Sequence, residues 1–136
     1  MTTPRFRRWV RVLFAVAILT PMLMPAASAQ TVATGRLMRE KLAHAQKVLE
    51  AIMTSNYAML DKESSALERV SEDPAWMVLK TPEYRRYSAS FMRASQALVA
   101  AAKDRDFDAA EVANQSLMTS CYQCHRYVKN ARVVTH

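Results

Sequence analysis

Glycine is almost absent from this chain of 136 residues, in which Gly35 is the single example. Hairpins and tight β turns need residues with positive φ, and glycine adopts that conformation at the lowest cost. The sequence also lacks internal repeats, low-complexity tracts and the alternation of apolar and polar residues that is typical of strands. These absences argue against an all-β fold and favour a single all-helical domain.

Acidic residues are missing from residues 1–29, which carry four arginines and then a short apolar run at residues 12–19. The run is shorter than the roughly 20 residues of a membrane-spanning helix, and Pro21 and Pro25 interrupt its continuation. The segment ends in Ala27-Ser28-Ala29, which completes the pattern of a secretory signal peptide. We predict cleavage after Ala29 and a periplasmic location, with a retained membrane anchor as the alternative.

The positive charge of the chain belongs largely to that segment. Four of the 19 Lys and Arg residues lie in it, so the predicted mature chain, residues 30–136, sets 15 basic residues against 12 acidic ones. Its formal charge is therefore +3, where the whole chain has +7. A charge this mild removes the case for nucleic acid as a partner, and no stable membrane span is expected after cleavage.

Apolar residues at helical spacing predict four helices in residues 30–136. The first covers residues 32–53, and the second follows an N-cap among Thr54, Ser55 and Asn56 and continues to about Val70. Thr81 and Pro82 predict the start of a third helix that ends near Lys103, because proline is favoured at the first helical position. The fourth covers about residues 107–131. Short connections between helices of this length predict an antiparallel four-helix bundle.

The spacing also predicts which side chains face the core. In the first helix the expected inner face consists of Met38, Leu42, Ala45, Leu49 and Ile52. The later helices are expected to turn inward Tyr57, Leu60, Ser64, Leu67 and Val70; then Tyr84, Tyr87, Phe91, Leu98 and Ala102; and finally Ala110, Asn114, Leu117, Cys121, Cys124 and Val128.

Residues 121–125 read Cys-Tyr-Gln-Cys-His, the signature for covalent attachment of c-type haem. Cys121 and Cys124 share one face of a helix, so both thiols can add to the two vinyl groups at one edge of a porphyrin. His125 follows directly and is predicted to bind the iron as proximal ligand. A redox-active cysteine pair, a zinc site and a structural disulfide are the alternatives, but each lacks the strand, the further ligands or the geometry that it needs.

Only 11 residues follow His125, so the opposite side of the haem must be covered by earlier parts of the chain. A four-helix chain with this motif near its C-terminus resembles the class II c-type cytochromes, of the cytochrome c-prime and cytochrome c-556 type. Lys129 matches the basic residue that the family carries beside the proximal imidazole, and residues 37–42 and 81–84 resemble one branch of these domains. The resemblance implies one covalent haem c on the last helix and, often, a homodimer through the first two helices.

The distal side of the haem decides the function in this family. Met38 is the candidate distal ligand, and its thioether would give a six-coordinate iron suited to electron transfer. Alternatively Met38 packs in the core, or His44 binds the iron. Arg36, Arg39 and Lys41 could pair with the haem propionates, or form a solvated face. Lys129 and Arg126 could tune His125, or favour the helix C-terminus through its dipole.

We therefore expect an exported monohaem c-type cytochrome that carries single electrons between periplasmic redox partner proteins and is not an enzyme. The alternative function is a five-coordinate cytochrome that binds a diatomic gas, nitric oxide or carbon monoxide. Peroxidase chemistry would need a distal histidine and arginine over an open iron, and His44 with Arg39 gives only a weak indication of that arrangement.

Overall fold

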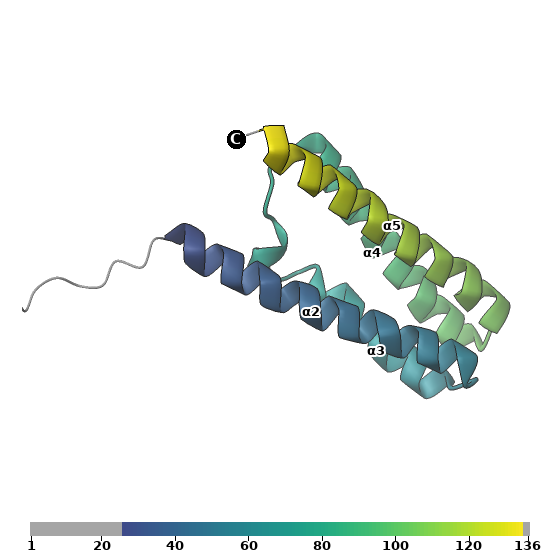
Figure 1. Ribbon diagram of the computed structural model, residues 1–136. Coiled ribbons are helices and arrows are strands. Elements are labelled where there is room, and N and C mark those ends of the chain that lie inside the picture. The colour runs from purple at the N-terminus through teal and green to yellow at the C-terminus, as the bar shows by residue number, and fades with distance from the viewer. Residues whose placement is uncertain (1–25, 135–136) are drawn as a thin grey trace, which may run out of the picture. The chain divides into compact units, whose positions relative to one another are not determined.

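The structure is a computed structural model that describes residues 26–134, and in these residues four α-helices and one short 3₁₀ turn account for all regular structure (Figure 1). The helices are α2 (Ala26–Met53), α3 (Tyr57–Val70), α4 (Pro82–Asp104) and α5 (Phe107–Val134), with the turn η1 at Pro74–Trp76. The all-helical prediction is confirmed.

The chain divides into two units, Met1–Thr31 and Val32–His136. The division falls two residues after Ala29, where we predict cleavage, although residues 1–25 of the predicted signal peptide lie outside the described part. Within the second unit, each helix runs back along the one before it, as expected for a bundle with short connections (Figure 1). None of the described helices combines the length and the apolar character that crossing a membrane requires.

Two helix starts form as their sequences predict. The Asn56 side chain accepts a hydrogen bond from the Met59 backbone N–H at 3.0 Å and so caps α3. Thr81 Oγ1 accepts from the Tyr84 backbone N–H at 3.2 Å and caps α4, with Pro82 at the first helical position. Both caps satisfy backbone donors that the helix itself leaves without a partner.

The centre of the bundle is built from large apolar side chains of α3, α4 and α5. Leu60, Leu67, Phe91, Leu98 and Leu117 are almost fully buried. Ser64 and Ser95 are buried among them, and each hydroxyl donates to the carbonyl four residues earlier, at 2.6 and 3.1 Å. The inner faces predicted for α3 and α4 are confirmed, with Tyr57 and Tyr87 half-buried at their edges.

The inner face predicted for α2 is partly wrong. Leu42 and Leu49 were expected in the core, but they are 58% and 47% exposed. The buried residues lie one position earlier along most of the helix: Leu37, Lys41, Ala45, Val48 and Ala51. The apolar pattern of α2 assigns Lys41 to solvent, but rings from other segments, Phe91 and Trp76, lie against its amine, so the buried face includes Lys41.

The end of the bundle where α4 turns into α5 is closed by an aromatic cluster. The Tyr57 ring stacks on Phe107 with centroids 3.9 Å apart, and its hydroxyl donates to the Arg105 carbonyl at 2.6 Å. Arg105 has a φ of 56°, the left-handed conformation that ends α4, and its guanidinium lies 5.1 Å from the Tyr57 ring. We call Tyr57, Arg105 and Phe107 the closing cluster.

The segment between α3 and α4 covers the core through Trp76. Its indole is buried and Nε1 donates to Ser88 Oγ at 3.0 Å, while the Tyr84 hydroxyl donates to the Trp76 carbonyl. Thr34 Oγ1 of α2 donates to the Ala75 carbonyl at 3.1 Å. The segment is thereby attached to both α2 and α4, as a loop that seals the core edge requires.

One acidic side chain, Glu63 of α3, is buried and paired with α2. Its Oε2 lies 2.7 Å from His44 Nδ1, and this hydrogen bond lowers the pKa of Glu63. Because the carboxyl has a lower pKa in the folded chain, its contribution to stability is present above pH 4.5, its ordinary value, and is lost as the pH falls through the lowered pKa.

We expect Glu63→Gln to lower the free energy of unfolding by about 1–2 kcal/mol at neutral pH, because the charge-assisted hydrogen bond is lost. Urea unfolding at pH 7 and pH 3 would measure this, and the variant should lose less stability than the parent between the two. Glu40→Gln is the matched control, since Glu40 lies 4.0 Å from the same imidazole but is exposed. An equal effect of both substitutions would contradict the assignment.

Candidate functional site

A pocket of about 400 Å³ lies between α2 and α5, and it contains most of the residues predicted to hold a cofactor. Met38, Arg39, Lys41, Leu42 and Ala45 of α2 form one wall, and Met118, Cys121, Tyr122 and His125 of α5 form the other. Its volume is within the range of ordinary ligand pockets. The structure thus brings together Met38, Arg39, Cys121 and His125 from opposite ends of the sequence.

Both cysteines are unpaired and half-buried against the core. Cys121 lines the pocket on the α2 side. Cys124 lies near Tyr84 of α4, where burial of the phenol is the main cause of a raised Tyr84 pKa and the charge of Cys124 raises it further. Burial raises the pKa of Cys124, and the positive charge of Lys41 acts in the opposite direction. The two thiols are therefore available for covalent chemistry on the interior side of α5.

The two predicted iron ligands lie on opposite walls of the pocket. His125 is exposed at the edge of the pocket, and the part of its surroundings that excludes water, followed by the charge of Lys41, lowers its pKa. This favours the neutral imidazole that can bind a metal. Met38 is half-buried on α2 and packs against the core. A flat ligand between α2 and α5 would therefore have an imidazole on one side and a thioether on the other.

Lys41 is a lysine buried inside the pocket, with only 6% of its surface exposed. Its Nζ lies 4.0 Å from the centre of the Phe91 ring and 4.8 Å from that of Trp76. Burial lowers the pKa of Lys41, while the nearby thiols of Cys121 and Cys124 raise it. No carboxylate of the described residues lies within ion-pair distance of Nζ.

A buried cation without an acidic partner is costly, and it favours an anionic ligand in the pocket. Sequence reasoning placed Lys41 only among possible propionate partners and did not predict its burial. The available signal was its spacing, four residues from both Leu37 and Ala45, which are buried on the same face. Phe91 was expected in the core but not beside the candidate site, and the sequence analysis did not place Trp76 there either.

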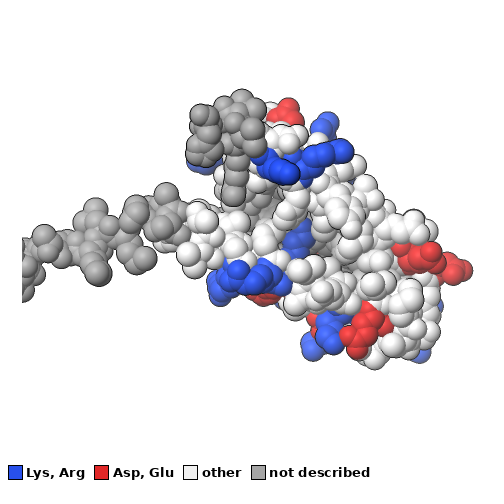
Figure 2. Space-filling model, in the orientation of Figure 1, with Lys and Arg blue, Asp and Glu red and all other residues white. Residues whose placement is uncertain are grey.

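Further cations surround the pocket. Arg39 lines it, and Arg36, Arg126 and Lys129 are exposed on α2 and α5. On the face drawn in Figure 2, Lys and Arg gather toward the part of the molecule where α2 begins, and a patch of Asp and Glu lies at the opposite end. An anionic cofactor would therefore meet a favourable potential at this end of the bundle.

His44 does not belong to the pocket. Its ring is held by Glu63 and is not among the residues of either wall. This position speaks against His44 as a distal ligand or as the histidine of a peroxidase site. In the described part of the chain, no three His, Cys, Asp or Glu side chains lie close enough to hold a metal ion by themselves.

The groups present fit a covalently bound haem: two free thiols at the required spacing, an adjacent imidazole, an apolar interior and cations for two propionates. Comparison of the chain with protein families, with curated proteins and with solved structures gives no significant match.

Proposed function

We propose that this chain is an exported monohaem c-type cytochrome of the class II kind, which passes single electrons between periplasmic partner proteins. The observation that carries the proposal is the pocket between α2 and α5, where Cys121 and His125 face Met38 around the buried Lys41. Haem c, when bound, supplies reversible one-electron chemistry at its iron. The chain supplies attachment, ligation, burial and charge.

Each side chain of the site has a distinct task in this proposal. Cys121 and Cys124 hold the cofactor covalently, as each S–H adds across one vinyl group without net oxidation. His125 binds the iron from α5 and Met38 binds it from α2. A thioether ligand favours the reduced state and keeps the geometry similar in both redox states, which suits fast electron transfer.

Lys41 and Arg39 neutralise the propionates in this proposal. Lys41 lines the pocket together with Cys121, and its Nζ now lies 4.0 Å from the centre of the Phe91 ring, beside the position that a porphyrin bonded to both thiols would take. The amine would then exchange its ring contacts for an ion pair, which is the stronger interaction for a buried cation. Lys129 remains exposed one turn after His125, where its charge can still influence the imidazole.

The test is production of the full chain, including residues 1–29, in a bacterium that attaches c-type haem. We expect a periplasmic protein that lacks residues 1–29 and whose mass is raised by one haem, with a pyridine derivative typical of two thioether bonds. The Cys121→Ala/Cys124→Ala double variant should lose covalent haem completely, because no other cysteine exists.

Ser120→Ala is the matched control, since Ser120 is a buried neighbour on the same helix. It should retain covalent haem in full. Absence of haem from the parent chain, or its presence in the double cysteine variant, would disprove the proposed function.

A further inference from the structure

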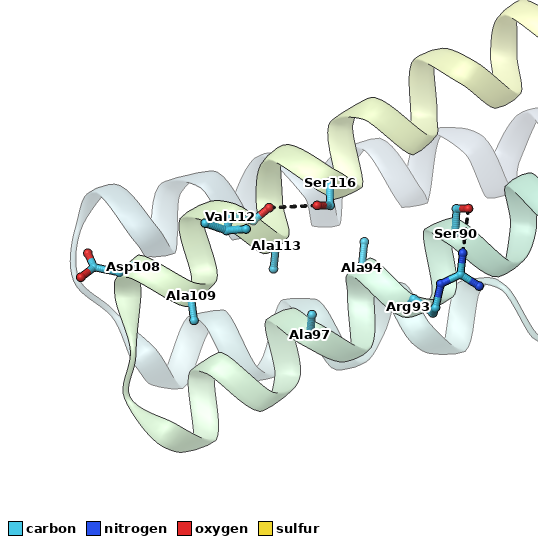
Figure 3. Close-up of a pocket in the computed structure, with 9 residues that line it drawn as sticks. All are labelled: Ser90, Arg93, Ala94, Ala97, Asp108, Ala109, Val112, Ala113 and Ser116. Atoms are coloured by element: carbon cyan, nitrogen blue, oxygen red, sulfur yellow. Dashed lines mark hydrogen bonds between the residues drawn. The ribbon is translucent and has the colours of Figure 1, made fainter.

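A second depression on the surface lies between α4 and α5 and shares no residue with the pocket of the candidate site. It is a groove of about 690 Å³, and Figure 3 shows its walls. Four small side chains from the two helices form its floor: Ala94, Ala97, Ala109 and Ala113. Small side chains leave room for a second pair of helices to approach closely.

The middle of this groove is unusually apolar for a helix surface. Val112 lines it and is 65% exposed, and Ala97 and Ala109 are exposed beside it. Of the described residues that line the groove, only Arg93 and Asp108 carry charge. An apolar centre with charge confined to its edges is the composition of a protein interface.

Arg93 and Asp108 stand at opposite ends of the groove (Figure 3). The chain turns at residues 105–106, so Asp108 on α5 is level with Lys103 on α4, ten residues beyond Arg93. A rise of 1.5 Å per residue separates the two charges by about 15 Å along the helices. By the same reasoning, Val112 is level with residue 99, which lies close to the midpoint between the levels of Arg93 and Asp108.

Neither charge is neutralised within the described chain. Arg93 donates a hydrogen bond to Ser90 Oγ at 3.1 Å, and neither Arg93 nor Asp108 takes part in an ion pair there. The groove therefore has a positive end and a negative end that are related by a half-turn about its centre. A surface of this kind is complementary to itself.

We propose that the α4–α5 groove is an interface with a second copy of this chain, related by a two-fold axis that passes between Ala97 and Val112. The half-turn places each Arg93 opposite Asp108 of the second copy and brings the two Val112 side chains onto the alanine floors. The charges fix the register of the helices, and burial of Val112 and the alanines supplies the attraction. The interface is independent of haem and differs from pairing through the first two helices.

Reversal of the charges tests both the surface and its symmetry. Arg93→Glu gives a groove with two negative ends and Asp108→Arg gives one with two positive ends, so each variant alone should repel itself. In an equimolar mixture, every introduced charge meets an opposite charge on the other variant. Sedimentation velocity on the purified haem-loaded protein should show dimers for the parent, at least about tenfold weaker association for each variant, and dimers again for the mixture.

Two further variants distinguish this surface from the competing one on α2. Val112→Glu should abolish dimers, whereas Leu49→Glu, at an exposed leucine of α2, should leave them intact. Circular dichroism would establish that each variant keeps its helices. A monomeric parent at millimolar concentration, a mixture that fails to associate, or dimers lost in Leu49→Glu and kept in Val112→Glu would each overturn the proposal.

Discussion

The Met38→Ala variant, loaded with haem and reduced, is expected to bind carbon monoxide stoichiometrically and fast, whereas the parent protein binds none. Met38 lies on the α2 wall of the pocket, across from His125. In the proposed cytochrome, removal of its thioether would leave the iron with His125 alone and would open the position that a diatomic gas takes. Optical spectra before and after addition of the gas measure the change, and the reduction potential should fall in the same variant.

Met118→Ala is the control for this experiment. Met118 lines the same pocket but lies on α5, the helix that carries the attachment motif. Its truncation should change packing without opening the iron. If the parent protein itself binds carbon monoxide rapidly, the gas-binding alternative replaces electron transfer. If Met38→Ala leaves the spectrum unchanged, the assignment of the distal ligand is wrong.

The second large effect is expected at Lys41. In the haem-free protein, Lys41→Met should raise the free energy of unfolding by about 1–4 kcal/mol at neutral pH, because an apolar side chain of similar length replaces an unpaired buried cation. Urea unfolding of the Cys121→Ala/Cys124→Ala protein, with and without the substitution, would measure it. This background also removes the two thiols whose charges raise the Lys41 pKa.

The dependence on pH gives this prediction a second readout. Burial lowers the pKa of Lys41 in the folded chain, so the unfolded chain binds more protons between that lowered pKa and 10.5. The stability of the parent should therefore rise with pH over this interval, and that rise should disappear in Lys41→Met. Lys103→Met, at an exposed lysine of α4, should keep the rise. Parallel pH profiles for all three proteins would contradict the burial of the charge.

Local signals predicted the start of α3 and both ends of α4 well, whereas α2 begins at Ala26, six residues before the predicted start at residue 32. Asn56 and Thr81 cap their helices through their own side chains, and Pro82 begins α4, so these boundaries depend on residues adjacent in sequence. Arg105 ends α4 for an equally local reason, since the apolar pattern stops there at four charged residues, 103–106. The inner faces of α3 and α4 also followed from spacing alone.

The orientation of α2 could not be obtained in that way. Lys41 lies inside because the rings of Trp76 and Phe91 and the thiol of Cys121 surround it, and these come from three other segments of the chain. Spacing within α2 therefore assigned Leu42 to the core in place of its neighbour. The attachment motif could be recognised without such information, because it consists of neighbouring residues of one helix, and its role in binding haem stays a prediction.

The closing cluster bears on how the cofactor enters. Tyr57, Arg105 and Phe107 tie α3 to the α4–α5 turn, about 20 Å along α5 from Cys121. If α2 separated from α5 at the pocket, the contacts of this cluster would stay intact. In the proposed cytochrome, a porphyrin could then enter between α2 and α5 while the far end of the bundle remains joined.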